Sequence, residues 1–77
     1  MNKARQKALG EIYNTLALLA ERLEELIDEE REALVNTPES LQNSDRYQSA
    51  EEAISSLEGA LDNLGYAYEY IKEAINS

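Results

Sequence analysis

The chain has 77 residues and contains neither cysteine nor histidine, so disulfide bonds and the usual zinc ligands cannot stabilise it. Its sixteen acidic and seven basic side chains give a net charge of −9, which disfavours direct binding to nucleic acid or to anionic membrane surfaces. Domains this small often need an additional stabilising element, and self-association is the one that remains. No segment approaches the ~20 apolar residues of a membrane-spanning helix, so we expect an intracellular protein.

Residues 3–35 are expected to form a first helix, because their apolar side chains recur every three or four positions. The expected contact seam is made of Leu9, Ile12, Leu16, Leu19, Leu23 and Leu26. A second row with a spacing of seven runs beside it and consists of Tyr13, Ala20, Ile27 and Leu34. Glu30 occupies a seam position, so we expect the contact to drift towards Ile27 and Leu34 there. A stripe of this width is typical of a helix in a bundle core.

Residues 36–44 are expected to form a corner between two helices. Thr37 and Pro38 are typical of a helix start, with Thr37 as the N-cap residue and the proline in the first helical position. Only a short helical turn is expected there. Ser44 is then expected to cap the second helix, where the negative charge of Asp45 favours the helix dipole.

Residues 45–76 are expected to form the second helix, with an uninterrupted apolar seam. Its members are Tyr47, Ala50, Ile54, Leu57, Leu61, Leu64, Tyr68, Ile71 and Ile75. Beside it runs a row of alanines, Ala53, Ala60, Ala67 and Ala74. This row favours close approach of another helix, although alanine is also simply the best helix former. The sequence leaves open whether the row faces its own hairpin or a neighbouring subunit.

Two helices of matched length joined by a short connection predict an all-α fold, a single antiparallel hairpin domain over residues 1–77. Neither helix can bury so wide a stripe against one partner. We therefore expect homo-oligomers, with a dimeric four-helix bundle as the first choice.

Acidic residues crowd the second half of the first helix. A straight helix spreads its carboxylates apart, which disfavours a calcium site. The set forms either a solvated helix face or a surface that binds a basic protein. In the second case we expect the partner-binding residues to be Glu21, Glu24, Glu25, Asp28, Glu29, Glu32, Tyr66 and Tyr70. The two tyrosines lie four residues apart on the more exposed side of their helix, where they could anchor a partner or cover a second subunit.

Catalysis has little support in the sequence. There is no cysteine or histidine, no glycine-rich phosphate-binding fingerprint, and no carboxylate pair that stands out from the others. We therefore expect a protein that is not an enzyme and that carries no cofactor and no metal.

The corner carries a more specific pattern, Asn36-Thr37-Pro38-Glu39-Ser40-Leu41-Gln42 followed by Ser44-Asp45-Arg46-Tyr47 and a Glu-Glu-Ala-Ile unit at 51–54. It resembles a family of small acidic helical proteins encoded in phages and prophages of Gram-positive bacteria. Asp45 stands where the family pattern has glutamate. The resemblance implies a phage-encoded protein in the bacterial host cytosol, but it implies no particular activity.

Three hypotheses follow for function. The corner groups Ser40, Gln42, Asn43, Ser44, Arg46 and Tyr47 could bind a small anionic ligand beside the N-terminus of the second helix, or could merely satisfy the backbone of the turn. A ligand site in a phage context suggests a protein that counters host defence by sequestering a nucleotide-derived immune signal in an oligomer. The alternative is an acidic adaptor or inhibitor that masks a basic surface of a host or phage protein. A purely structural assembly component is the third possibility.

Overall fold

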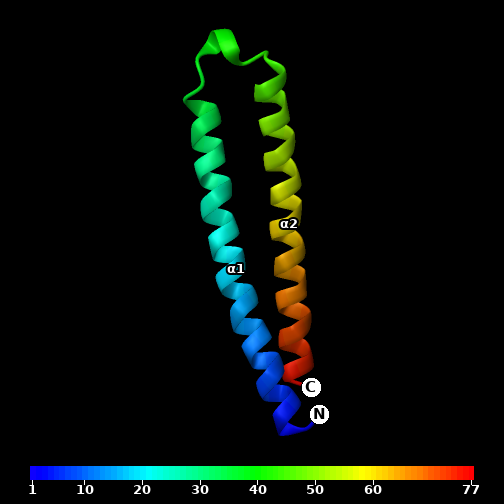
Figure 1. The fold of residues 1–77 in the computed structure, drawn as a ribbon. Coiled ribbons are helices and arrows are strands. Elements are labelled where there is room, and N and C mark those ends of the chain that lie inside the picture. The colour runs from blue at the N-terminus through cyan, green and yellow to red at the C-terminus, as the bar shows by residue number, and fades with distance from the viewer.

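A computed structural model describes all residues, 1–77, as two helices joined by a short corner (Figure 1). Helix α1 spans Lys3–Val35 and helix α2 spans Asp45–Ile75, with the 3-10 turn η1 at Glu39–Leu41 between them. The helix ranges expected from the sequence differ from these by at most one residue. The helices run antiparallel, so the two ends of the chain lie together at the end opposite the corner (Figure 1). The fold is an all-α hairpin.

Local side-chain chemistry explains where the helices begin. The Asn2 side chain accepts a hydrogen bond of 2.8 Å from the backbone N–H of Arg5 and so caps α1. The Ser44 hydroxyl does the same for α2, accepting from the N–H of Tyr47 at 3.2 Å. Pro38, which has no N–H to donate, follows two residues after the C-cap Asn36 and prevents α1 from continuing.

The two helices meet along one seam. Its α2 side is the row expected from the sequence, and its α1 side is made of Leu9, Tyr13, Leu16, Ala20, Leu23, Ile27 and Leu34, all at least partly buried. Only Ile27 and Ile54 are buried almost completely, at 1% and 6% exposed. The seam shifts to Ile27 and Leu34 around the exposed Glu30, which confirms the expected drift. The hydrophobic core is thus a single line of side chains.

The expected α1 seam is wrong at three of its six positions. Ile12, Leu19 and Leu26 remain 49%, 53% and 39% exposed. The two apolar rows of α1 compete for the contact with α2, and α1 is rotated so that the row containing Tyr13 and Ile27 faces inward. The displaced row is therefore left at the edge of the seam.

A tyrosine pair accompanies this rotation. The rings of Tyr13 and Tyr68 stack with their centroids 4.0 Å apart and their planes inclined by 18°, a contact that adds to simple burial of the rings. The Tyr68 side chain raises the pKa of Tyr13 to about 12. The stack places residue 13 of α1 at the level of residue 68 of α2.

An ion pair joins the helices nearer the corner. The guanidinium of Arg31 lies 3.0 Å from Glu58 of α2 and 3.0 Å from Asp28 of α1. Glu58 contributes most to raising the pKa of Arg31 above its ordinary value. Because all three side chains are about half exposed or more, we expect the pairs to contribute at most about 1 kcal/mol each. The contact between Arg31 and Glu58 identifies one of the two open sides of the hairpin.

The opposite side of the hairpin is apolar. At 100° per residue, the row Ile12, Leu19 and Leu26 lies about 80° to one side of the α1 seam and Arg31 about 45° to the other. On α2 the alanine row lies about 90° to one side of the seam and Glu58 about 70° to the other. Since Arg31 and Glu58 meet, the two apolar rows must share the other side. We call this surface the open apolar face: Ile12, Leu19, Leu26, Ala53, Ala60, Ala67 and Ala74 with the adjoining edge of the seam.

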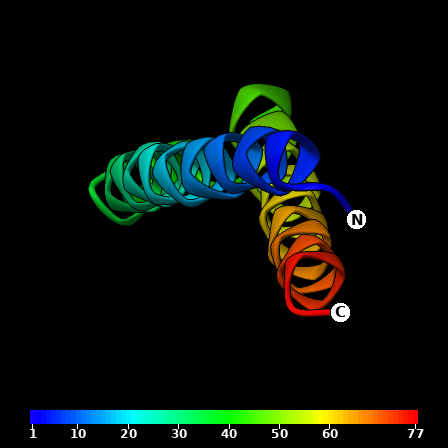
Figure 2. The same ribbon diagram turned by 90° about the horizontal axis from the view of Figure 1, so that it is seen from below.

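The molecule is long and thin. It measures 59 × 14 × 13 Å, and its radius of gyration is 17.5 Å, against about 11.5 Å for a compact domain of this length. Figure 2, seen along the hairpin, shows the two helices inclined to each other with no third layer. Neither helix is both long enough and apolar enough to cross a membrane.

We expect Ile27→Ala to lower the free energy of unfolding by about 2–4 kcal/mol, because it removes the most buried side chain of a single-line core. Leu18→Ala is the matched control, since Leu18 lies on the outer side of α1 and is 67% exposed; its effect should stay below about 0.5 kcal/mol. Urea unfolding followed by circular dichroism measures both. Equal losses in the two variants would contradict the burial of Ile27 in the seam.

Candidate functional site

The corner differs from the sequence expectation at its first residues. Thr37 is not an N-cap, because its hydroxyl donates to the carbonyl oxygen of Ala33 at 2.9 Å. Pro38 itself occupies the N-cap position of η1, and no side chain caps that turn. The threonine hydroxyl instead bonds back to α1, an interaction open to any threonine four residues after a helical carbonyl. The short turn expected between the helices is present as η1.

Two shallow grooves flank the seam at the corner end. The first, which we call the corner groove, has a volume of about 410 Å³ and is bordered by Glu30, Ala33, Ser44, Arg46, Tyr47 and Ala50, among others. The second, of about 380 Å³, is lined by Arg31, Gln42, Tyr47, Glu51 and three apolar side chains. Tyr47 borders both grooves. The structure thus divides the six expected ligand-binding residues rather than bringing them together.

Several of those residues are already bonded within the corner. The Ser44 hydroxyl accepts from Tyr47 and donates to the carbonyl oxygen of Leu41 at 2.8 Å. The Gln42 amide donates to the carbonyl oxygen of Thr37 at 3.3 Å. Ser40 and Asn43 border neither groove. The polar groups of the corner therefore largely stabilise its backbone, and Arg46 and Tyr47 are the pair left for a ligand.

The corner groove has mixed charge. Arg46 forms no ion pair within 4 Å, unlike Arg31. Glu30 borders the same groove, and its carboxylate opposes the approach of an anion. That Glu30 and Arg46 share a groove could not be predicted from the sequence, because they lie on different helices and are brought together only by the register of the hairpin.

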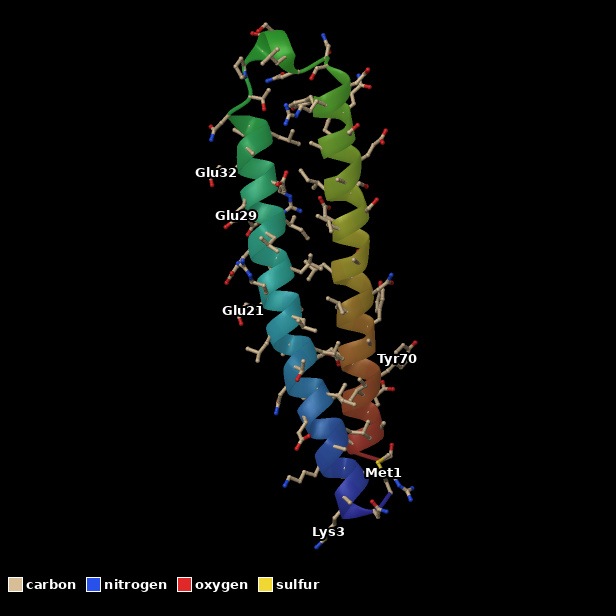
Figure 3. The ribbon with its side chains drawn as sticks, viewed as in Figure 1. Met1, Lys3, Glu21, Glu29, Glu32 and Tyr70 are labelled. Atoms are coloured by element: carbon tan, nitrogen blue, oxygen red, sulfur yellow. The ribbon has the colours of Figure 1, made fainter.

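The acidic residues of α1 form a separate surface, which we call the acidic strip: Glu21, Glu24, Glu25, Asp28, Glu29 and Glu32. All six are exposed, and Figure 3 shows Glu21, Glu29 and Glu32 pointing away from α2. Arg22 pairs with Glu25 at 3.0 Å and Arg31 with Asp28, which leaves the other four without a cationic partner. No three carboxylates converge closely enough to hold a metal ion.

Tyr66 and Tyr70 lie on the outer side of α2 and are 64% and 71% exposed. Figure 3 shows Tyr70 directed away from α1. The acidic strip and the tyrosine pair therefore lie on opposite outer sides of the hairpin. One flat partner cannot contact all eight expected partner-binding residues at once.

Comparison with protein-family models, with curated proteins and with solved structures finds no match to this chain. The resemblance of the corner motif to phage-encoded proteins stays an expectation.

We expect Ser44→Ala to lower the free energy of unfolding by about 1 kcal/mol, because it removes the cap of α2. Ser49→Ala, at an exposed position one turn into the same helix, is the control and should change stability by less than about 0.5 kcal/mol. Thermal unfolding of the two variants provides the measurement. A fully stable Ser44→Ala protein would mean that this hydroxyl is free to serve a ligand instead.

Proposed function

We propose that the protein is a non-enzymatic binding protein, acting as a homo-oligomer, that presents its acidic strip to a basic protein surface. The exposure of six carboxylates along the outer side of α1 carries the proposal. Four of them have no cationic partner in the hairpin. They are held on a rigid helix, so their spacing is fixed before a partner arrives.

The electrostatic consequence is a localised negative surface. Glu21 and Glu32 lie eleven residues apart, or about 17 Å along a helix, so the strip spans several charges of a partner. Charges of one sign arranged in this way accelerate association with an oppositely charged protein. A basic surface that normally binds nucleic acid would be masked by such a strip. The resemblance of the corner motif suggests that the partner is a host or phage protein.

Self-association belongs to the same proposal. The hairpin exposes 5995 Å², against about 4,700 Å² for a compact monomer of its mass. The excess of roughly 1,300 Å² exceeds the ~800 Å² that each partner buries in an ordinary stable interface. Two hairpins that cover each other's open apolar face would form a four-helix bundle and leave both acidic strips in solvent.

Neutralising the strip tests the proposal. We expect the triple variant Glu21→Gln, Glu24→Gln, Glu32→Gln to bind a ten-residue oligolysine peptide about tenfold more weakly than the unmodified protein, because three aligned charges are lost. Isothermal titration calorimetry at an ionic strength of about 0.05 M measures the affinity. Raising the ionic strength to about 0.5 M should weaken binding of the unmodified protein by at least as much.

The matched control places the same change in net charge on α2, as Glu52→Gln, Asp62→Asn, Glu73→Gln, all at exposed positions. This variant should lose less than about threefold in affinity, since the altered charges do not line the strip. Equal losses in both variants would show that total charge alone drives binding, and would refute the strip as a site.

A second function is favoured by one observation, the placement of Arg46 and Tyr47 on a groove of about 410 Å³. An unpaired guanidinium beside an aromatic ring can bind phosphate and stack on a base. The groove would then hold a nucleotide-derived immune signal, and the protein would counter host defence by sequestering it. Glu30 opposes this role, so we rank it below the acidic strip.

Native mass spectrometry with a panel of cyclic dinucleotides and cyclic ADP-ribose isomers tests the second function. Sequestration predicts a stoichiometric ligand on a defined oligomer and loss of that ligand in Arg46→Ala, because the phosphate partner is removed. Glu30→Gln should strengthen binding of the same ligand by removing the opposing charge. A complete absence of binding across the panel, or unchanged phage protection by Arg46→Ala, would rule it out.

A further inference from the structure

The open apolar face leaves large apolar side chains in solvent. Its composition and symmetry indicate that a second copy of the chain covers it. The α1 row and the α2 row lie on the same side of the hairpin, because residues that continue both rows line the corner groove. Ala33, which continues the row of Leu26 by seven residues, borders that groove together with Arg46, which precedes Ala53 by seven. A shallow groove of about 470 Å³, lined by α1 residues alone, includes Ile12 and Leu19 and shows that the α1 row is open to solvent at the other end.

Both rows are centred at one level of the hairpin. The stack of Tyr13 on Tyr68 places Leu19, six residues further along α1, level with Asp62, six residues earlier on α2. Leu19 is the middle member of the α1 row, between Ile12 and Leu26. Level 62 falls between Ala60 and Ala67, the middle pair of the alanine row. A two-fold axis that crosses the hairpin at this level would pack the α1 row against the α1 row of the partner subunit, and the alanine row against the partner's alanine row.

Charge is distributed unevenly along the hairpin. Thirteen of the sixteen acidic residues and three of the seven basic ones lie within residues 19–62, the half that contains the corner. That half therefore carries a net charge of −10, and the half that contains the two chain ends carries +1. Two hairpins with their corners together would place both strongly negative halves side by side. The opposite orientation sets each negative half beside the weakly positive half of the other copy, which costs less electrostatic energy.

We propose that two copies pack through the open apolar face in antiparallel orientation, so that α1 faces α1 and α2 faces α2 across a two-fold axis near Leu19. This inference rests on the self-association included in the proposed function. Ile12 then packs against Leu26 of the partner subunit, and the alanine rows allow the two α2 helices to approach closely. The arrangement is a four-helix bundle in which each corner lies beside the partner's chain ends.

The same arrangement accounts for Glu30. This residue occupies a seam row together with Leu9, Leu16 and Leu23 but remains exposed at the edge of the open apolar face. With the axis at Leu19, residue 30 is level with residue 8 of the partner subunit. Arg5, which belongs to the row of Ile12, is one helical turn away and reaches Glu30 with its long side chain. Glu30 and Arg5 of the partner subunit form an ion pair at each end of the interface.

Cysteine cross-linking tests the orientation, and the chain contains no native cysteine that could interfere. Leu19→Cys places two thiols across the two-fold axis, within the range of a disulfide. Mild oxidation should yield a covalent dimer at least about tenfold faster than for Leu18→Cys, the neighbouring residue on the outer side of α1, because only the former thiols are held together. Equal rates for the two variants would overturn the proposal.

An equimolar mixture of Leu19→Cys and Ala60→Cys proteins distinguishes the opposite orientation. With the corners together, α1 would face α2 of the partner, and the mixed 19–60 product would dominate in the mass spectrum. A dominant mixed product would overturn the antiparallel arrangement while leaving self-association intact. Sedimentation of the unmodified protein as a monomer would instead contradict the self-association itself.

Exchanging the charges of Arg5 and Glu30 tests the proposed ion pair without changing the apolar contacts. We expect Arg5→Glu and Glu30→Arg each to weaken the dimer by roughly fivefold, and the double variant to regain most of that loss, because the pair is restored with reversed sign. Lys3→Glu combined with Glu30→Arg is the matched control, since Lys3 does not belong to the row of Arg5. Recovery in the control, or none in the Arg5 double variant, would contradict the ion pair.

Discussion

The structure depends on a mismatch between the width of the apolar stripe on each helix and the width of a contact with one other helix. Two rows of large side chains on α1 compete for one seam, and α2 can cover only one of them. The row with Tyr13 and Ile27 obtains the contact, and the row with Leu19 does not. Only two residues of 77 are buried, so the hairpin leaves much of its apolar surface in contact with solvent.

The corner shows how a polar segment can look like a binding site and yet serve the fold. A chain reversal after 33 helical residues leaves terminal carbonyl and N–H groups without helical partners. The side chains of Thr37, Gln42 and Ser44 form hydrogen bonds with several of these carbonyl and N–H groups. A polar group used in this way cannot be given to a ligand without loss of a structural bond. Arg46 is different, because nothing in the corner requires it.

Properties that depend on local sequence could be predicted. The helix ranges followed from the three- and four-residue spacing of the apolar side chains and from the capping residues. Ser44 could be predicted as a cap because it precedes an acidic residue and a long apolar repeat. The hairpin followed from two helices of equal length and a short connection. Each of these inferences uses residues within a few positions of one another, where the geometry of the chain is known in advance.

Properties that depend on the rotation and register of two helices could not be predicted. The rows of Leu19 and Ile27 are comparably apolar, so their order of burial is decided by small differences in packing against α2. The contact of Arg31 with Glu58, and the position of Glu30 and Arg46 on one groove, depend on the axial level of both helices. The same knowledge places the alanine row: Ala53 and Ala60 are exposed, whereas Ala67 and Ala74 are half-buried. The row therefore flanks the seam near the corner and joins its edge near the chain ends.

The two proposed surfaces are compatible because they occupy different sides of α1. Packing through the open apolar face covers the row of Leu19, whereas most of the acidic strip points outward and remains in solvent. An antiparallel dimer carries the two strips in opposite halves of one rod. A partner that offers two basic surfaces at the matching distance would then bind both at once, and the second contact would form at a high effective concentration. Self-association would thus complete the hydrophobic core and also set the spacing at which the protein recognises its partner.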